Sequence, residues 1–126
     1  MAHPYHHAVS SSKKHGGVPE DYLALHDWFD QTKAHLPDAH HRAILHSSFG
    51  IFLCEQVFGA TLTNSSGQQI PVRVLGEQHV KEDMGGKIPT VQDWLEGLPL
   101  KPWMVTGAQR LSREEGSDGS ADRAGV

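Results

Sequence analysis

Apolar residues recur at the spacing of one helix face in the segment that starts at Pro19, and they are Tyr22, Leu25, Phe29 and Leu36. Pro19 suits a first helical turn because its missing N–H costs nothing there, and the acids that follow it lie at the positive end of the helix dipole. The pattern predicts a helix over residues 19–36. A shorter helix, from His7 to Lys14, is expected before it and ends at Gly16 and Gly17.

A second helix is expected from Pro37 to about Phe58, followed by Gly59. Its apolar residues surround nearly the whole circumference, and they are Ile44, Leu45, Phe49, Ile51, Phe52, Leu53, Val57 and Phe58. A helix that is apolar on all sides belongs in the interior of a domain. The two long helices are therefore predicted to pack against each other, antiparallel, at the centre of the fold.

The pattern changes to alternation after Gly59. Residues 60–63 and 69–75 have the alternation of strands, and the turn-forming residues 64–67 lie between them, which predicts a β-hairpin. This hairpin is expected to pack on the two helices.

The segment that follows the hairpin is more polar. Residues 76–87 are expected to form a loop. Thr90 and Asp93 are spaced as in a capping box, which predicts a short helix over residues 90–98. The fold class is thus α+β, with two main antiparallel helices packed with a β-hairpin and a short C-terminal helix.

Length and charge fit a single domain. The chain has 126 residues and a formal net charge of −4, which makes nucleic acid an unlikely partner. Apart from Leu111 and Val126, large apolar residues are missing from Thr106 onward, so residues 1–105 are predicted to form one compact domain and residues 106–126 a disordered tail. Neither a membrane-spanning stretch nor a secretion signal is evident, and a cytoplasmic location is expected. The lone Cys54 lies in an apolar run and is expected to be a small buried side chain.

Histidine is the strongest chemical signal, with ten residues in all and nine of them among the first 46. It is a common metal ligand and proton shuttle. His26 falls on the apolar stripe of its helix, where an unpaired imidazole is costly, and Asp30 lies one turn beyond. His41 and His46 are five residues apart, a rotation of about 140°, which is not a zinc signature. A structural hydrogen bond stays open as the alternative role for each imidazole.

One histidine and three carboxylates gather in residues 76–83, which indicates a binding loop, with a solvated acidic loop as the alternative. Convergence of this segment with the helical histidines would make a site for zinc, iron or manganese. The candidate ligands are His26, His41, His46 and His79. The candidate carboxylate partners are Asp30, Glu77, Glu82 and Asp83.

Several motifs occur in an order that resembles a known family. They are His3-Pro4-Tyr5-His6-His7-Ala8, His26-Asp27-Trp28-Phe29-Asp30, His41-Arg42-Ala43 with His46, Pro71-Val72-Arg73, and Gly76-Glu77-Gln78-His79-Val80 with Glu82-Asp83. Over residues 1–104 the chain resembles an uncharacterised family of small, histidine-rich bacterial and phage proteins, known only as a domain of unknown function. The resemblance implies a compact α+β domain and brings no activity with it. That family tends to have a second histidine where this chain has Ser47, which leaves His46 as the candidate.

Two functions of different classes fit these observations. The first is a small soluble metal-binding protein, hydrolytic if the metal keeps an open position. A phosphate loop, a G-x-S-x-G elbow and an H-E-x-x-H pair are absent, so whether it is an enzyme stays open. The alternative is a non-catalytic interaction module or phage or host accessory protein, acting through a partner or homo-oligomer surface anchored by Trp28, Trp94 and Trp103. A metal-free acid–base pair of His79 and Glu82 is a third possibility.

Overall fold

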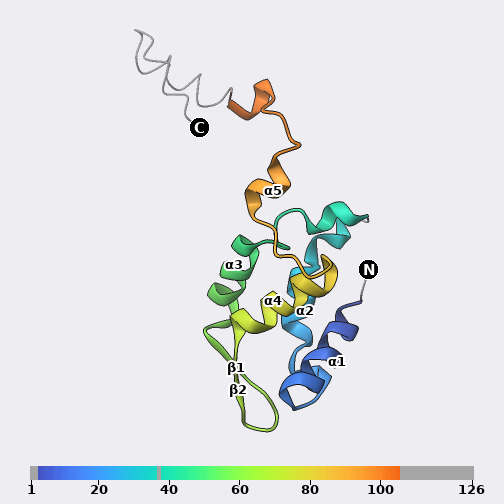
Figure 1. Cartoon of the computed structure of the whole chain (residues 1–126), viewed down its shortest axis with the longest axis vertical. Coiled ribbons are helices and arrows are strands. Elements are labelled where there is room, and N and C mark those ends of the chain that lie inside the picture. The colour runs from blue at the N-terminus through green and yellow to red at the C-terminus, as the bar shows by residue number, and fades with distance from the viewer. Residues whose placement is uncertain (1–2, 37, 106–126) are drawn as a thin grey trace. The chain divides into compact units, whose positions relative to one another are not determined.

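The computed structural model describes residues 3–36 and 38–105. Three short 3-10 helices (Pro19–Asp21, Gln31–Ala34 and Ala39–Arg42) accompany the elements labelled in Figure 1, which are α1 (Pro4–His15), α2 (Leu23–Phe29), α3 (Ser48–Phe58), β1 (Thr61–Thr63), β2 (Gln69–Pro71), α4 (Val72–Asp83) and α5 (Val91–Leu95). The α+β class is confirmed. The chain divides into two units, Met1–Trp94 and Leu95–Val126, and the buried core lies within the first. One compact domain over residues 1–105 stays a prediction, and the expected tail lies outside the described residues.

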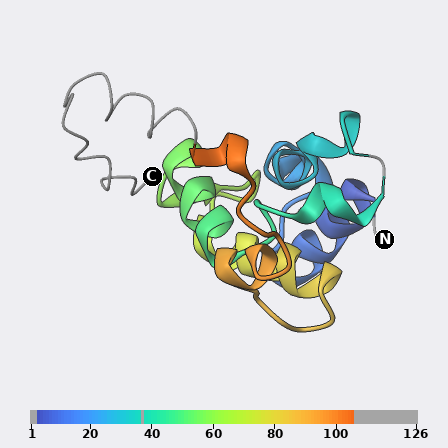
Figure 2. The same ribbon diagram turned by 90° about the horizontal axis from the view of Figure 1, so that it is seen from above.

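The core forms where four helices meet the hairpin. Helix α3 packs against α4, and the two lie side by side in Figure 2, green and yellow; α1 packs against α2. The buried apolar side chains come from all of these elements, and they are Ala8, Tyr22, Leu25, Phe29, Leu45, Ile51, Cys54, Ile70, Val72, Leu75 and Val80. Burial of this apolar surface is the main force that holds the helices together.

The helix expected over residues 19–36 is broken into three shorter helices. Helix α2 ends at Phe29, and Asp30 leaves helical geometry with φ −104° and ψ 12°. The break turns the Asp30 carboxylate into the interior, where only 5% of the residue is exposed. The apolar periodicity runs through the break, so the pattern could not reveal it.

The prediction of one helix from Pro37 to Phe58 is wrong in its first half. Ser47 has an extended backbone and its Oγ accepts from the Gly50 N–H over 3.1 Å, so it caps α3 and the helix begins at Ser48. A serine N-cap satisfies a backbone donor that a continuous helix would bond elsewhere. The expectation of burial on all sides is also wrong, because Phe52 and Val57 are more than half exposed.

The hairpin is confirmed, with shorter strands than expected. Leu62 pairs with Ile70 in the antiparallel register. The strand expected over 69–75 ends at Pro71, and the loop expected over 76–87 is wrong, because α4 occupies most of it. The buried positions of α4 recur at helical spacing, and they are Val72, Leu75, Gly76, Gln78, His79 and Val80. Of the polar residues of the expected loop, Lys81 and Glu82 lie on the exposed face of this helix, whereas Gln78 and His79 are buried.

The remaining local predictions fare better. The N-terminal helix is confirmed and starts earlier, at Pro4. The capping box is confirmed, because Thr90 N donates to Asp93 Oδ2 and Asp93 N donates to Thr90 Oγ1. Cys54 is buried, as expected. Within residues 3–36 and 38–105, no helix has the length and apolar character that a membrane crossing needs.

Candidate metal centre

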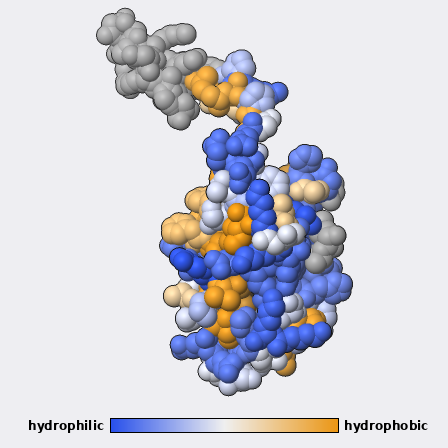
Figure 3. All heavy atoms as spheres, viewed as in Figure 1, coloured by the Kyte–Doolittle hydropathy of each residue, from blue (hydrophilic) through white to orange (hydrophobic). Residues whose placement is uncertain are grey.

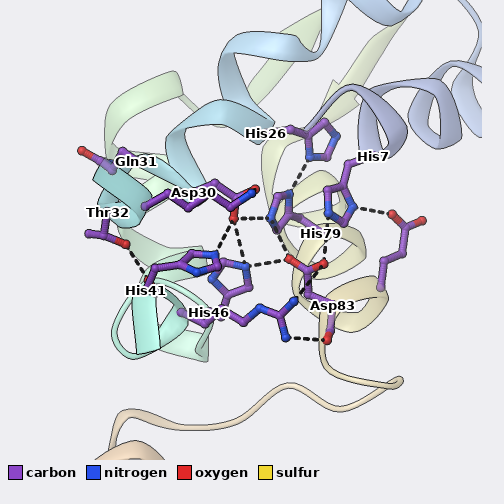
Figure 4. A network of polar contacts seen from close by, with 12 residues as sticks. His7, His26, Asp30, Gln31, Thr32, His41, His46, His79 and Asp83 are labelled. Atoms are coloured by element: carbon purple, nitrogen blue, oxygen red, sulfur yellow. Dashed lines mark hydrogen bonds and ion pairs between the residues drawn. The ribbon is translucent and has the colours of Figure 1, made fainter. Parts of the chain in front are cut away.

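Five histidines and two aspartates converge in the interior of the first unit and are drawn in Figure 4. We call them the His/Asp cluster, and its members are His7, His26, Asp30, His41, His46, His79 and Asp83. The side chains of this cluster are at most 3% exposed, and His26 is fully buried. So many buried polar groups need partners, because an unpaired polar atom in the interior is costly.

The members come from several parts of the fold. Helix α4 supplies His79 and Asp83, one turn apart on one face. Helix α1 supplies His7, and α2 supplies His26, with Asp30 directly after its end. The 3-10 helix Ala39–Arg42 and the segment before α3 supply the remaining two, His41 and His46. The site therefore exists only when the whole unit is folded.

The Asp30 carboxylate faces three imidazoles. Its Oδ1 lies 3.4 Å from the Nε2 of His41, 3.5 Å from that of His46 and 3.5 Å from that of His79. None of these contacts is a hydrogen bond in the structure, and both oxygens of Asp30 lack a hydrogen-bond partner. One oxygen of Asp30 thus lies close to three ring nitrogens and accepts a hydrogen bond from none of them.

The Asp83 carboxylate divides its oxygens between two sides. Its Oδ2 lies 2.9 Å from His46 Nε2 and 3.3 Å from His79 Nε2. Its Oδ1 lies 3.2 Å from His7 Nε2. Arg42 holds the same residue from outside, because its Nη1 donates to the Asp83 carbonyl over 3.2 Å. Asp83 is therefore shared by most of the cluster.

Two imidazoles donate a hydrogen bond from Nδ1, the ring nitrogen that faces away from the two aspartates. His41 Nδ1 donates to the Asp38 carbonyl over 2.8 Å. His7 Nδ1 donates to Glu82 Oε1 over 2.7 Å, at the edge of the cluster. In both rings the Nε2 atom points inward and has no hydrogen-bond partner, as is also true of His79 Nε2. Histidines that bind metals commonly show this arrangement.

Both carboxylates of the cluster are held in the ionised form. Burial raises the pKa of Asp83, but the hydrogen bond with His46 and the close contact with His7 outweigh it and hold the pKa well below its usual range. Burial likewise opposes ionisation of Asp30, and contacts with His79 lower its pKa below the usual value. The interior therefore carries two negative charges.

The imidazoles differ in their affinity for a proton. Burial lowers the pKa of His26 to about 2, together with the neighbouring His79 and His7 rings, so His26 is neutral. Burial also lowers the pKa of His46. Burial acts in the same direction on His7, but the close contact with Asp83 and the hydrogen bond with Glu82 outweigh it and raise its pKa. His7 therefore lies between two carboxylates that favour its charged form.

The structure brings most of the predicted ligands together. His26, His41, His46, His79, Asp30 and Asp83 all lie in the cluster. Glu82 touches it only through His7. Glu77 lies apart, in a pocket beside Glu55 and Arg73.

His7 is the cluster member that the sequence analysis did not select. The sequence held a signal for it, because the spacing of His7, Ala8 and Ser11 places them on one face of a helix, and this face of α1 is buried. The spacing is weak evidence alone, because nothing in it says which element that face covers.

The three tryptophans proposed as anchors of an interaction surface differ in their exposure and packing. Trp28 is packed against Phe29 and Phe58, and Trp94 donates from Nε1 to the His46 carbonyl over 2.9 Å. Of the three tryptophans only Trp103 is largely exposed, at 71%. Exposed apolar side chains form scattered patches on an otherwise hydrophilic face (Figure 3). Two of the three proposed anchors therefore contribute to packing.

These features define a small α+β domain with a buried cluster of histidine and aspartate that has the donors to bind a metal ion. The chain belongs to the family described as Domain of unknown function (DUF6915), whose model matches residues 2–104. The resemblance seen in the sequence motifs is thereby confirmed as to family. No curated protein and no solved structure matches the chain.

Proposed function

We propose that this protein binds one divalent transition-metal ion in the His/Asp cluster. The ion takes the Nε2 atoms of three imidazoles and one oxygen of each carboxylate. These five ligands are His41, His46, His79, Asp30 and Asp83. His7 lies beside them, where its Nε2 faces the second oxygen of Asp83, and His26 lies behind His79.

The observation that carries the proposal is that imidazole lone pairs face carboxylate oxygens. The Asp38 carbonyl can only accept, so His41 Nδ1 carries a proton, and in the neutral ring Nε2 has a lone pair. That lone pair lies 3.4 Å from Asp30 Oδ1. Two electron-rich atoms repel in a buried site unless a cation lies between them.

Protons are a poor choice for that cation. Protonation of every inward Nε2 would place several positive rings side by side. His7 and His79 stack with ring centroids 3.9 Å apart, a distance at which two imidazolium ions repel strongly. A single divalent ion balances the two ionised carboxylates, Asp30 and Asp83, and leaves the ligand rings neutral.

The carboxylate–imidazole distances are those expected of ligand atoms that share one ion. Ligand atoms that bind one ion at about 2.0–2.2 Å lie roughly 3.0–3.5 Å from their neighbours. Asp30 Oδ1 is 3.4–3.5 Å from its three imidazole nitrogens. Asp83 Oδ2 is 2.9 Å from His46 Nε2 and 3.3 Å from His79 Nε2. The ligand atoms of His7, Asp30, His79 and Asp83 all lie within 4.8 Å of one another, so His41 and His46 join the coordination by side-chain movement.

The donor set narrows the choice of ion. Imidazole and carboxylate without thiolate suit zinc, iron and manganese. Structural zinc usually takes four ligands, whereas the cluster offers five or, with His7, six. This number favours iron(II) or manganese(II) over zinc.

Hydrolysis is the second candidate function, and the position of Arg42 between a surface pocket and the cluster favours it. Arg42 lines a surface pocket with Asp38, Met84 and Trp94, and it also contacts Asp83. This pocket is the side from which a substrate would approach the cluster. A bound ion with an open position would supply Lewis acidity and a water of lowered pKa. Turnover of phosphate or carboxylate esters with iron or manganese, and its loss with a chelator, tests this candidate.

Metal binding itself is tested with a matched pair of variants. Asp30→Asn removes the charge at the centre of three imidazoles, and Asp27→Asn removes an exposed charge one turn earlier. Isothermal titration of chelator-treated protein with manganese and zinc is expected to give one site in wild type and in Asp27→Asn. In Asp30→Asn the affinity is expected to fall by more than ~10-fold. Equal binding by both variants, or none in folded wild type, would overturn the proposal.

A further inference from the structure

A chain of hydrogen bonds runs behind the His/Asp cluster and ends at His79. It begins at the neighbouring residue of α4, Gln78, which is 7% exposed. Gln78 Nε2 donates to the His7 carbonyl over 3.2 Å. Because a carbonyl only accepts, this contact fixes the orientation of the amide and leaves Oε1 as an acceptor on the other side.

Ser11 on α1 is the next member of the chain. Its hydroxyl donates to Gln78 Oε1 over 3.2 Å. Serine has a single hydroxyl proton, so in the 2.8 Å contact between Ser11 Oγ and His26 Nε2 the imidazole is the donor. The neutral His26 ring therefore carries its one proton on Nε2.

The direction of the chain then sets the state of His79. With its proton on Nε2, His26 has a lone pair on Nδ1, and this atom lies 2.9 Å from His79 Nδ1. His79 must donate in that contact, so a neutral His79 ring has its proton on Nδ1. Its Nε2 is left with a lone pair, directed at Asp30 Oδ1 and Asp83 Oδ2.

We propose that Ser11, His26 and Gln78 are positioning residues that hold His79 in its metal-binding tautomer, an inference that rests on the function proposed above. A histidine ligand usually donates its second N–H to an acceptor, which orients the ring and raises its basicity. Here that acceptor is another imidazole, whose own tautomer is set from α1. The reverse direction of the chain would put the proton on His79 Nε2 and block metal binding.

Helix α1 would thereby act on metal affinity without contacting the metal through Ser11. Ser11 lies on the buried face of α1 with His7 and has no contact with Asp30 or Asp83 among those measured. A change at Ser11 is therefore expected to act on affinity through His26 and His79. The effect of such outer contacts is typically about 10–100-fold in metal affinity.

The test compares metal affinity in four forms of the full chain: wild type, Ser11→Ala, Gln78→Met and Ser12→Ala. Ser11→Ala removes the acceptor of the His26 proton. Gln78→Met removes the acceptor of the Ser11 hydroxyl proton. The Ser11 hydroxyl can then donate to His26 Nε2, which favours the opposite tautomer of His26. Ser12→Ala is the matched control, because the Ser12 hydroxyl bonds only locally, to the Val9 carbonyl over 2.9 Å. Titration with zinc and manganese gives the affinity, and circular dichroism confirms that each form is folded.

We expect both Ser11→Ala and Gln78→Met to weaken metal binding by about 10–100-fold and Ser12→Ala to leave it unchanged. Nitrogen-15 spectra of the zinc-loaded wild type are expected to place the His26 proton on Nε2. Wild-type affinity in folded Ser11→Ala and Gln78→Met, or a His26 proton on Nδ1, would overturn this inference and leave the proposed function standing. Absence of metal binding by wild type would overturn the proposed function and this inference with it.

Discussion

Replacement of Gly50 by alanine is expected to damage both the fold and the metal centre. Gly50 is buried in the first turn of α3, where the chain of Leu45 crosses it closely. A Cβ at position 50 would lie 2.6 Å from Leu45 Cα and closer still to the Leu45 carbonyl. Backbone atoms cannot rotate away as a flexible side chain can, so the segment before α3 must move.

The size of the movement decides the outcome. To restore an ordinary contact with the Leu45 carbonyl oxygen, which is the nearest atom, the backbone must withdraw by roughly 1.5 Å, whereas metal–ligand distances tolerate about 0.2 Å. His46 follows Leu45 directly, so its Nε2 leaves the position beside Asp83. Overpacking of this kind costs about 1–3 kcal/mol, and the better helix propensity of alanine recovers at most ~1 kcal/mol of it.

Two assays on Gly50→Ala separate these effects, with Gly97→Ala as the control because a Cβ at position 97 meets no atom within 4 Å. Thermal unfolding with a chelator is expected to show a Tm lowered by about 4–8 °C for each kcal/mol lost. Titration with manganese is expected to show at least ~10-fold weaker binding. A Gly50→Ala protein with the Tm and the metal affinity of wild type would refute the reasoning.

Three further predictions concern single side chains. His41→Ala is expected to weaken metal binding by more than ~10-fold, whereas His40→Ala, whose side chain is 81% exposed, keeps it; equal affinities in titration would contradict the ligand assignment. Burial raises the pKa of the Cys54 thiol to about 12, so it is expected to resist disulfide reagents at pH 8 until the chain is unfolded in guanidinium, and rapid labelling of native protein would count against its burial. The folded-state pKa of Asp83 lies below the unfolded value of about 3.9, so its stabilisation is complete above that pH and is lost as the pH falls toward the folded pKa. Urea unfolding without metal is therefore expected to show Asp83→Asn losing more stability, relative to wild type, at pH 6 than at pH 3, and an equal loss at both would contradict the sign.

Local signals in the sequence predicted the elements that local interactions decide. The N-terminal helix, the hairpin and the capping box of Thr90 with Asp93 depend on contacts within a few residues. The break at Ser47 is of a different kind. Its hydroxyl competes with the helical hydrogen bonds for the Gly50 N–H, and the apolar residues on either side gave no sign of which would win.

Helix α4 shows where a readable signal was misread. Val72, Leu75 and His79 recur at helical spacing, but the alternation of Ile70, Val72 and Val74 fits a strand equally well. Pro71 ends the strand and the helix starts at once, so no loop separates the two. A histidine and an aspartate four residues apart then share one buried face, which a loop would not have required.

The members of the His/Asp cluster were largely predictable by residue type, and their assembly was not. A buried imidazole needs a partner, which directed attention to His26 and Asp30, and both are buried in the cluster. His7 contacts Asp83 and so joins α1 to α4, two helices that lie far apart in the sequence of the first unit. Such a contact depends on how the helices pack, and no spacing within one segment encodes it.

The central claim is that the His/Asp cluster holds a metal ion, and metal content tests it most directly. The measurement is elemental mass spectrometry on protein purified without an affinity tag, for wild type, His79→Ala and the surface control His40→Ala. The account predicts about one metal ion per chain in wild type and in His40→Ala, and its loss in His79→Ala. Folded wild type that holds no metal, even after incubation with zinc, iron and manganese, would contradict it.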